Sequence, residues 1–486
     1  MQKSMPNTIT ESLKEKTAKG LFWGTISNGI QQILGAIFGI FFARILTQED
    51  YGLVGTLAVF TGMVSLIQDS GFSAALINKK EIKHEDYNAV FWFGLFTGII
   101  TYGILFFCAP FIALFFKAPE LVNVSRVLFL WFLIGGAASA HSALMQKRLM
   151  IKERAIIAVI ALITSNGIGL VLVFKGFAYW ALVIQTVVHA IAIVVLTWIL
   201  SPWRPTLDIN FRPLKKMFAF SSKLLITGMF NLVNSNIFAV LLGRYYDTKR
   251  ELGEYSQANK WTTMGYTFVG GIIGSVAHPV LAEVAHDKER QLWIFRKMMR
   301  FTAFISFPAM FGLAFISNEL ILITITDKWQ TSVPIMQVLC IGAAFLPITS
   351  LYSFLFISRG NSDINMWNII TAGMLQLVVA YFMLPYGVLN MVFVYVSINI
   401  FWILIDYFIT NRLIKYSFIH LLKDIVPFLL AAGIAIGVTC CVVSFIENIY
   451  ISLCIKMVMV AGIYIIIMRL TNARIFQETI VYLLKK

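Results

Sequence analysis

Charged residues are scarce in this chain, and that scarcity limits its class. Only 13% of the 486 residues are Asp, Glu, Lys or Arg, whereas 59% are hydrophobic and the mean hydropathy is +0.80. A soluble globular domain has about 25% charged and about 45–50% apolar residues. A water-soluble protein of this composition would lack the polar side chains needed to cover its core. The composition therefore predicts a chain that lies mostly within a lipid bilayer.

Cysteine is also scarce, and its placement argues against disulfides and metal centres. The five cysteines lie in apolar stretches, and none belongs to a Cys-x-x-Cys pair. They are Cys108, Cys340, Cys440, Cys441 and Cys454. We expect them to be small buried hydrophobic side chains. His141, His189 and His278 lack the spacing of metal ligands, so no metal site is expected.

Motifs for catalysis and nucleotide binding are missing as well. The sequence has no Walker motif, no Gly-x-Gly-x-x-Gly, no nucleophile elbow and no carboxylate pair spaced for catalysis. The largest loop, near 201–218, has fewer than about twenty residues, which leaves no room for a soluble catalytic domain. We therefore expect neither an enzyme nor a bound cofactor.

A removable signal peptide is not expected either. The first 20 residues hold four lysines and no apolar core that precedes a cleavage site. Residues 12–19 instead have the pattern of a short amphipathic helix on the membrane surface.

Long apolar segments dominate what is present. A membrane-spanning helix needs about 20 mostly apolar residues, and about fourteen segments meet this rule. They lie near 20–43, 52–70, 88–110, 121–145, 155–174, 177–200, 219–243, 258–282, 299–326, 332–357, 364–384, 387–410, 425–446 and 449–469. The second and the eighth are the weakest, because they are rich in Gly, Ser and Thr. The predicted fold is an all-α integral membrane protein.

The distribution of basic residues predicts the orientation. With fourteen spans, about 29 of the 39 Lys and Arg residues fall on the side that holds both termini, and basic residues favour the cytoplasm. Both termini are therefore predicted to be cytoplasmic. The net charge of +15 reflects this topology, and no nucleic-acid partner is expected.

A short motif recurs 200 residues further along the chain. Phe42-Ala43-Arg44 precedes Glu49-Asp50-Tyr51-Gly52, and Leu242-Gly243-Arg244 precedes Leu252-Gly253-Glu254-Tyr255. Six predicted helices separate the two copies, so both copies have the same orientation. We predict two parallel-repeat bundles of about six helices each, at 1–200 and 201–411, with the substrate site between them. Residues 412–486 would add two further transmembrane helices and a cytoplasmic tail.

Amide side chains form two predicted polar stripes. Asn28 and Gln31 share one face of the first apolar segment, and Asn231 and Asn234 share one face of the seventh. Polar side chains inside a membrane usually face a cavity or another helix. These stripes could bind a substrate or could form hydrogen bonds between helices, and the sequence leaves both readings open.

Cationic candidates accompany the stripes. Arg44, Arg244, Lys223 and Lys260 lie within or near the ends of apolar segments. The planar fork of arginine suits phosphate, so a pair of such residues could bind a diphosphate. The alternative is that they reach lipid headgroups or pair with nearby carboxylates. Asp69, at the end of the second segment, could carry a coupling proton or simply anchor a helix end.

Several motifs resemble those of the polysaccharide transporter family. Ala43-Arg44-Ile45-Leu46 with Glu49-Asp50-Tyr51-Gly52 is similar to one signature of that family, and Asp69-Ser70-Gly71-Phe72 to the next. Further matches are Asn88-Ala89-Val90-Phe91-Trp92, Trp203-Arg204-Pro205, Gly243-Arg244, Leu252-Gly253-Glu254-Tyr255 and Pro385-Tyr386-Gly387. Together they run from about residue 15 to 420, in the order and spacing of the family.

The resemblance implies a Wzx-type flippase for lipopolysaccharide or exopolysaccharide, within the multidrug/oligosaccharidyl-lipid/polysaccharide exporter superfamily. Such proteins move an undecaprenyl-diphosphate-linked oligosaccharide across the bacterial cytoplasmic membrane by alternating access. The implied partners are that lipid-linked oligosaccharide and membrane lipids, with a polysaccharide polymerase and chain-length machinery as further candidates.

Three alternatives remain at this stage. A multidrug-type small-molecule antiporter should carry carboxylates in its cavity, whereas the candidate residues here are basic or amides. A membrane polysaccharide polymerase or glycosyltransferase should have a large outer loop or a catalytic acid–histidine set, and neither is visible. A third alternative is a scaffold protein that transports nothing. The predicted polar stripes argue against it only weakly.

Overall fold

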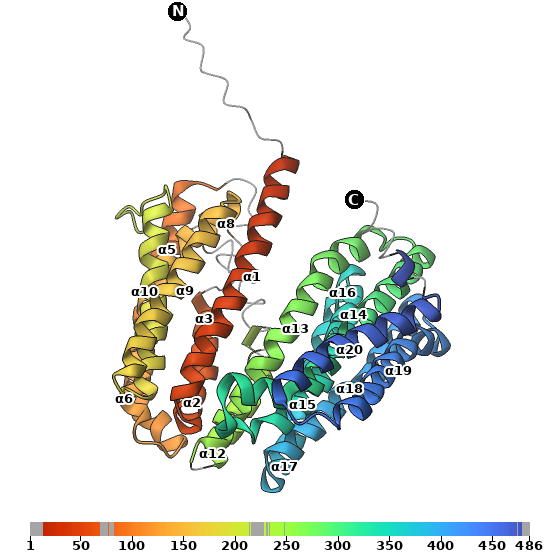
Figure 1. The fold of residues 1–486 in the computed structure, drawn as a ribbon. Coiled ribbons are helices and arrows are strands. Elements are labelled where there is room, and N and C mark those ends of the chain that lie inside the picture. Colours follow the sequence, from red (N-terminus) through yellow and green to blue (C-terminus); the bar gives the residue numbers. More distant parts are fainter. Residues whose placement is uncertain are drawn as a thin grey trace, which may run out of the picture. The chain divides into compact units, whose positions relative to one another are not determined.

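The described part of the chain is helical throughout. The computed structural model describes residues 13–68, 76, 82–212, 214, 228–229, 232, 234–246, 248–473 and 475–478, and these contain no β-strand. The chain packs into two compact units, Met1–Asn236 and Ile237–Lys486, drawn from red to yellow-green and from green to blue in Figure 1. The sequence predicts three domains, 1–200, 201–411 and 412–486. This two-unit division does not test those boundaries, so they remain a prediction.

The first unit contains ten described helical elements. They are α1 (Leu13–Ile45), α2 (Gln48–Gly55), α3 (Ala58–Gln68), α5 (His84–Phe115), α6 (Leu121–Leu128), α7 (Leu130–Gly135), the 3-10 turn η1 (Gly136–Ala138), α8 (Ser139–Lys147), α9 (Ile151–Phe174) and α10 (Tyr179–Leu200). The elements α6, α7, η1 and α8 follow one another within a single apolar stretch, Leu121–Lys147.

The second unit contains eleven described helical elements. They are α12 (Ile237–Tyr245), α13 (Arg250–Glu283), α14 (Lys288–Ile325), η2 (Asp327–Trp329), α15 (Ser332–Ala343), α16 (Leu346–Ser358), α17 (Ser362–Met383), η3 (Leu384–Tyr386), α18 (Val388–Ile414), α19 (Phe418–Val443) and α20 (Ile449–Leu470).

Eleven helical stretches of the described residues are long and apolar enough to cross a membrane. They are Ile26–Ile45, His84–Phe115, Leu121–Lys147, Ile151–Phe174, Tyr179–Leu200, Lys288–Ile325, Ser332–Ser358, Ser362–Tyr386, Val388–Ile414, Phe418–Val443 and Ile449–Leu470. Each coincides with a predicted segment, which confirms the all-α membrane fold. The predicted segments at 52–70 and 219–243 are described only in part, and 258–282 lies in the more polar helix α13. The predicted count of fourteen is compatible with these helices.

The start of α1 differs from the expectation. Residues 12–19 were expected to form a short amphipathic helix on the membrane surface; the described residues 13–19 are helical, but they are the first turns of the 33-residue helix α1. No residue between 13 and 45 interrupts the helix, because this stretch contains no proline and its glycines are isolated.

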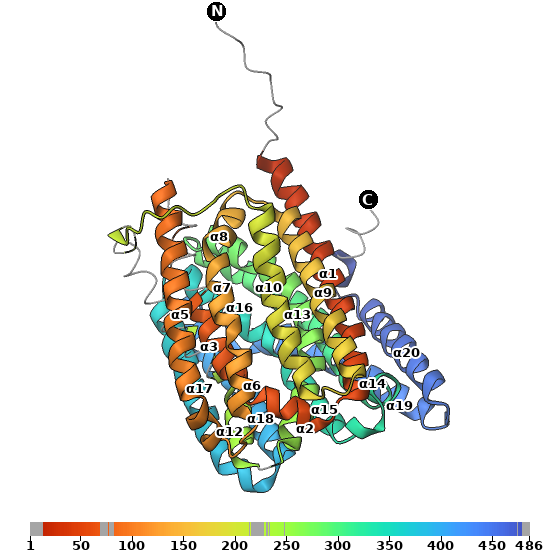
Figure 2. The ribbon, with the colours of Figure 1, turned by 90° about the vertical axis from the view of Figure 1, so that its left-hand side faces the viewer.

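Small residues allow the helices of the first unit to pack closely. Figure 2 shows α9 beside α1 and α10. A Cβ atom at Gly169 of α9 would lie 2.7 Å from Cζ of Phe42 in α1 and 3.1 Å from Cβ of Gln185 in α10. Only glycine allows this approach. The contact fixes the C-terminal end of α1, where Arg44 lies.

The segment after α10 is fastened to the first unit by side-chain hydrogen bonds. Asn88 of α5 accepts a bond from the backbone N–H of Thr206 (2.9 Å) and donates one to the carbonyl of Asp208. Trp92 Nε1 donates to the Thr206 carbonyl at 2.8 Å. His141, which is fully buried, lies 3.0 Å from the hydroxyl of Ser201. Residues 201–208 therefore pack as part of this unit.

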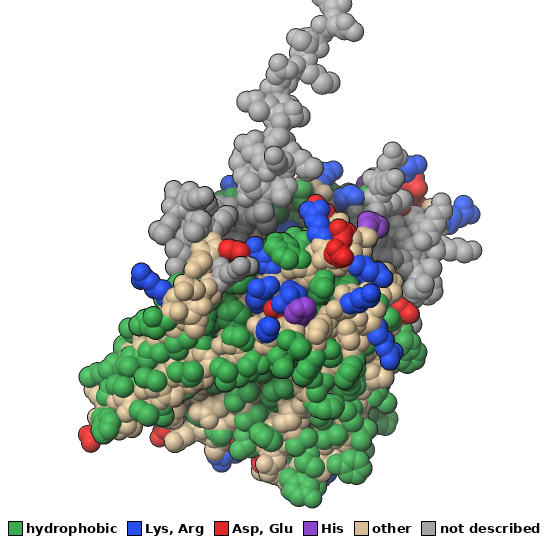
Figure 3. Space-filling view, turned by 90° about the vertical axis from the view of Figure 1, so that its right-hand side faces the viewer, with side chains coloured by type: hydrophobic (Ala, Val, Ile, Leu, Met, Phe, Trp, Pro, Cys, Tyr) green, Lys and Arg blue, Asp and Glu red, His purple; other side chains and the backbone are tan. Residues whose placement is uncertain are grey.

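The surface has the polarity of a membrane protein. On the face in Figure 3, hydrophobic side chains cover a broad band and charged side chains gather mainly at one end. Many large apolar side chains are exposed, among them Phe107 at 76% and Phe445 at 88%. In hydrocarbon such exposure carries no penalty, because lipid replaces water as the neighbour.

The cysteines are in part a correction to the sequence prediction. All five are free, as expected, and Cys340 is buried. Cys440, Cys441 and Cys454, however, are exposed rather than buried. The prediction was wrong for these three because an apolar side chain in a membrane protein can face lipid as well as the core.

Candidate functional site

In the polar stripe of α1, Gln31 forms hydrogen bonds within the helix, whereas Asn28 forms none with the described residues. Gln31 Nε2 donates to the hydroxyl of Ser27 at 2.9 Å and to its carbonyl at 3.3 Å, one turn earlier. Asn28 is exposed, and it makes no hydrogen bond to any residue that the structure describes. Asn28 therefore offers both a donor and an acceptor to a ligand, whereas Gln31 is partly engaged.

Arg44 lies in the last turn of α1 and is exposed. After it the chain breaks and restarts as α2, where Thr47 and Asp50 form a capping box. One carboxylate oxygen of Asp50 accepts from the backbone N–H of Thr47 at 2.9 Å, and the other accepts from the backbone N–H of Tyr179 at 3.1 Å. Asp50 thus has a structural role, and it fixes the α2 end against α10.

Arg244 has the same local position in the second unit. It lies in the last turn of α12 and is exposed. The ammonium group of Lys249, which is buried, donates to the carbonyls of Gly243 (2.8 Å) and Tyr246 (2.9 Å) and so caps the C-terminal end of α12. The chain then restarts as α13 with Glu251 in its first turn. Both arginines therefore precede a break and a new helix with an acidic first turn.

Of the other predicted site residues, the structure describes some and leaves others undescribed. Lys260 is half-buried on α13, and Asn234 is half-buried just before α12. Lys223, Asn231 and Asp69 lie outside the described residues. Arg44, Asn28 and Gln31 belong to the first unit, whereas Arg244 and Lys260 belong to the second.

A further polar stripe, on α13, was not predicted from the sequence. Asn259, Thr263 and Thr267 are exposed at a spacing of four residues, so they lie on one face of the helix. The 34 residues of α13 extend about 50 Å, which is enough to cross a bilayer. The four-residue period is visible in the sequence, but the exposure of this face depends on how α13 packs. A face of hydroxyl and amide groups on a helix of this length can bind sugar hydroxyl groups or water.

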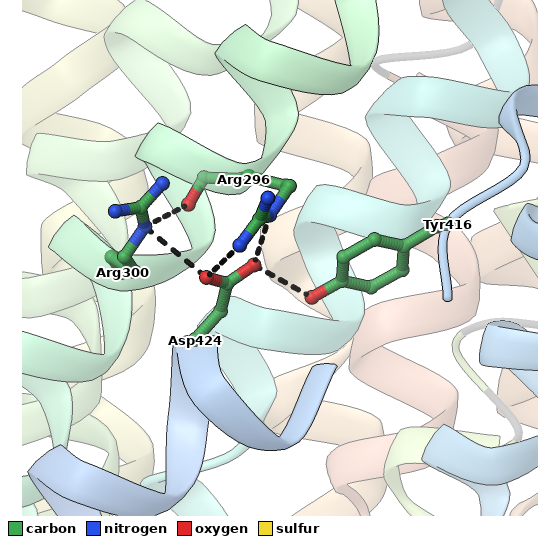
Figure 4. A network of polar contacts seen from close by, with 4 residues as sticks. All are labelled: Arg296, Arg300, Tyr416 and Asp424. Carbon is green, nitrogen blue, oxygen red and sulfur yellow. Dashed lines mark hydrogen bonds and ion pairs between the residues drawn. The ribbon is translucent and has the colours of Figure 1, made fainter. Parts of the chain in front are cut away.

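An ionic network at the N-terminal end of α14 was also missed. Arg296 holds the carboxylate of Asp424 in α19 with two bonds, from Nε at 2.9 Å and from its terminal amino group at 3.2 Å (Figure 4). Arg300 adds a contact from Nε at 3.2 Å. Tyr416 donates to the same carboxylate at 3.2 Å, and burial raises the pKa of its phenol, so it remains a donor. The sequence does not reveal this network, because Arg296 and Asp424 are 128 residues apart.

A second ion pair joins α14 to α20 further along the helix. Lys456 Nζ lies 2.5 Å from Oε1 of Glu319, and the hydroxyl of Ser452 donates to the same oxygen at 3.1 Å. Both charged side chains are nearly buried, at 12% and 8% exposure. Charges in the apolar part of a helix bundle are expensive unless paired, so α14 must keep α20 in register.

The described residues offer no conventional metal centre. No group of three or more His, Cys, Asp or Glu side chains among them is arranged to hold a metal ion. The chemistry that the described positions do support is binding: exposed arginines at two helix ends and exposed amides and hydroxyls on α1 and α13.

Comparisons with known sequences identify relatives in bacterial glycan synthesis. The family described as "Polysaccharide biosynthesis protein" matches residues 41–334. Teichuronic acid biosynthesis protein TuaB of Bacillus subtilis is 25% identical over 355 residues, which are 73% of each chain. Lipopolysaccharide biosynthesis protein WzxC of Escherichia coli is 24% identical over 73% of this chain and 72% of its own. Succinoglycan biosynthesis transport protein ExoT of Rhizobium meliloti is 22% identical over 87% and 83%.

Solved structures share the fold. A lipid II flippase, MurJ, in an inward closed conformation has a TM-score of 0.77 at 16% identity, over 94% of this chain and 100% of that protein. An inward-facing multidrug resistance transporter of the MATE family has a TM-score of 0.64 at 15% identity, over 81% and 99%. At these identities the likeness extends to the helical transporter fold.

Proposed function

This chain belongs to the polysaccharide biosynthesis protein family, and from that premise we propose that it is a flippase for the lipid-linked precursor of a surface polysaccharide. It is a transporter rather than an enzyme. The observation that carries the proposal is the family match over residues 41–334. The names of its relatives, a lipopolysaccharide biosynthesis protein and a succinoglycan biosynthesis transport protein, point to the same process.

The substrate that fits best is an undecaprenyl-diphosphate-linked oligosaccharide. Its polyprenyl tail is soluble in hydrocarbon, whereas its diphosphate and sugars are not, because an unpaired charge in hydrocarbon is very costly. A protein that moves the headgroup must therefore replace the lost hydration. The exposed amide of Asn28 and the exposed stripe of Asn259, Thr263 and Thr267 supply the hydrogen-bonding groups that such a path needs.

We assign the diphosphate to cationic residues and the sugars to amides. Arg44 and Arg244 are the proposed diphosphate ligands, because both are exposed at helix ends and arginine binds phosphate with two parallel bonds. Lys223 and Lys260 are proposed as further cations, and Asn28, Gln31, Asn231 and Asn234 as sugar ligands. Asp69 is the proposed coupling residue. Transport would proceed by alternating access.

The proposed cellular setting follows from the same family. The relatives are bacterial, and the chain is a multi-pass membrane protein, so we place it in the cytoplasmic membrane with both termini in the cytoplasm. The lipid-linked oligosaccharide and membrane lipids are its immediate partners. A polysaccharide polymerase and chain-length machinery would take up the product on the outer side, for O-antigen or exopolysaccharide synthesis.

Deletion in the native host tests the function. We expect the lipid-linked oligosaccharide to accumulate in the inner leaflet and the surface polysaccharide to be lost, because synthesis would continue without export. Mass spectrometry of extracted lipids, before and after an impermeant reagent labels the outer leaflet, measures both pools. A deletion strain with normal surface polysaccharide and no inner-leaflet accumulation would contradict the proposal. Re-expression of the intact chain is the control.

A further inference from the structure

Two arginines of the second unit share a single counter-charge. Arg296 and Arg300 of α14 both contact the carboxylate of Asp424. The arginine side chains are 23% and 29% exposed, whereas that of Asp424 is 1% exposed. The phenol of Tyr416 adds a hydrogen bond to this carboxylate but no charge. Two guanidinium groups on one carboxylate leave an excess positive charge, which a single monovalent anion would neutralise.

Other acids of the described chain do not supply this missing negative charge. Glu478, which follows α20, pairs with Lys297 at 2.5 Å. Glu319, further along α14, pairs with Lys456. No further described acid lies within ion-pair distance of the two arginines. Lys423 of α19 is exposed and adds to the positive charge at this position. The described residues therefore leave the cluster positively charged.

Several donors of both arginines remain available. Arg300 contacts Asp424 and the carbonyl of Arg296 through Nε alone, so neither of its terminal amino groups bonds to a described residue. Arg296 keeps one terminal amino group unused, because Nε and the other amino group hold Asp424. In Figure 4 both terminal nitrogens of Arg300 point away from Asp424. Such a guanidinium edge can donate two parallel charge-assisted bonds to a phosphate.

The packing of α14 on α19 holds these donors in position. α14 and α19 contact each other along their length, and Asp424 fixes Arg296 with bonds of 2.9 and 3.2 Å. The Nε–H of Arg300 is fixed at 3.2 Å from the same carboxylate. Groups that are already ordered lose little conformational freedom when a ligand binds. The cluster is therefore preorganised for an anion.

Side chains around the cluster have the pattern of a membrane–water boundary. Trp293, three residues before Arg296, is 60% exposed, and Nζ of Lys297 lies 5.5 Å from the centre of its ring. Tryptophan is enriched at the level of the lipid headgroups. Ile419 and Leu422, in the first turns of α19, are also exposed. On the face in Figure 3, charged side chains gather beside the hydrophobic band. The cluster thus lies where lipid headgroups meet the protein.

We propose that Arg296 and Arg300 bind the phosphodiester of an anionic phospholipid. A phosphodiester carries a single negative charge, which matches the excess positive charge of the cluster. A zwitterionic lipid also has a phosphate, but its ammonium group would restore the positive charge, so a headgroup such as phosphatidylglycerol fits better. Anionic lipids of the cytoplasmic leaflet attract basic clusters, which agrees with the predicted cytoplasmic position of this end of α14.

The lipid site does not depend on the proposed function. It lies at the contact of α14 with α19, within one unit, and it can be tested on the purified protein without any transport assay. A ligand that binds only the folded protein stabilises it. Phosphatidylglycerol should therefore raise the melting temperature of the wild type, because its phosphate would neutralise the excess charge of the network that joins these helices.

Lipid titration of the delipidated full-length chain in detergent tests the proposal. Native mass spectrometry counts bound lipids, and the wild type should bind phosphatidylglycerol more tightly than phosphatidylethanolamine. Arg300→Gln should weaken the tightest binding about tenfold, because it removes a charge-assisted contact. This variant keeps the ion pair of Arg296 with Asp424, so it should fold, and size-exclusion profiles verify this. Arg300→Lys, which keeps the charge but not the fork, is the second variant and should bind with intermediate affinity.

Arg412→Gln is the matched control for the lipid titration. Arg412 is exposed in the last turn of α18, outside the cluster, and its loss should leave phosphatidylglycerol binding unchanged. Equal binding by the wild type and Arg300→Gln would overturn the proposal, as would equal affinity of the wild type for the two phospholipids. Two competitors test the source of the phosphate. Displacement of the lipid by sodium phosphate, or tighter binding of undecaprenyl phosphate, would also overturn the assignment to a phospholipid.

Discussion

At the scale of single residues, the arginines of the repeated motif carry the proposed diphosphate contact. Arg44 and Arg244 each lie exposed in the last turn of a helix, followed by a break and a new helix. This shared local geometry favours a shared role. Helix C-termini carry a partial negative charge, so a cation there is also stabilised by the helix itself.

The double variant Arg44→Ala with Arg244→Ala should abolish most export. Each lost charge-assisted contact weakens binding by about 1.5–3 kcal/mol, which is at least about tenfold per arginine. Surface polysaccharide measured in the deletion strain complemented with the variant reports the loss, and membrane fractionation should show normal insertion. Arg44→Lys should retain part of the activity, because it keeps the charge but not the fork.

Arg412→Ala provides the matched control. Arg412 is also exposed in the last turn of a helix, α18, but lies outside the repeated motif. Its loss should leave export unchanged. Full export by the Arg44→Ala, Arg244→Ala protein would remove both arginines from the proposed site.

At the scale of helices, α14 holds the last two helices through buried ion pairs. Asp424 of α19 is 1% exposed and contacts two arginines, while Lys456 of α20 contacts Glu319. A buried pair is strongly destabilising when one partner is removed, because the other charge stays in a medium of low polarity.

Asp424→Ala should therefore lower stability by about 3–5 kcal/mol, because Arg296 and Arg300 would lose their counter-charge. Tyr416→Phe removes only one hydrogen bond and should lower it by about 0.5–1.5 kcal/mol. Fluorescence-detected size exclusion after heating ranks the variants. Asp363→Ala, an exposed acid on α17, is the control and should melt with the wild type. Equal melting of all four proteins would contradict the structural role.

The helices themselves were largely predictable from the sequence, whereas their polar contacts were not. Apolar segments of about 20 residues have few alternatives to a spanning helix, which is why eleven of the predicted spans coincide with described helices. The sequence could not show which acid pairs with which base. Arg296 and Asp424 are 128 residues apart, and only the packing of α14 on α19 brings them together. Likewise, the exposure of Cys440 depends on which helix face meets lipid.

At the scale of the whole molecule, the positive-inside rule predicts that both termini are cytoplasmic. Alkaline phosphatase fused after residue 486 should be inactive and a green fluorescent protein fused there should be fluorescent, because the first folds only outside the cytoplasm and the second only inside. The same two reporters placed after Gly176, in the loop between α9 and α10, should give the opposite result. Active phosphatase at the C-terminus would contradict its predicted cytoplasmic placement.

The two ion pairs of α14 also bear on how the second unit can deform. One pair lies near the N-terminal end of the 38-residue helix α14 and holds α19. The other lies about six turns further along α14 and holds α20. If α14 tilts during a transport cycle, we expect α19 and α20 to move with it as one rigid body. A chain truncated before α19 would leave two arginines and a glutamate without their counter-charges, and we expect cellular quality control to degrade it.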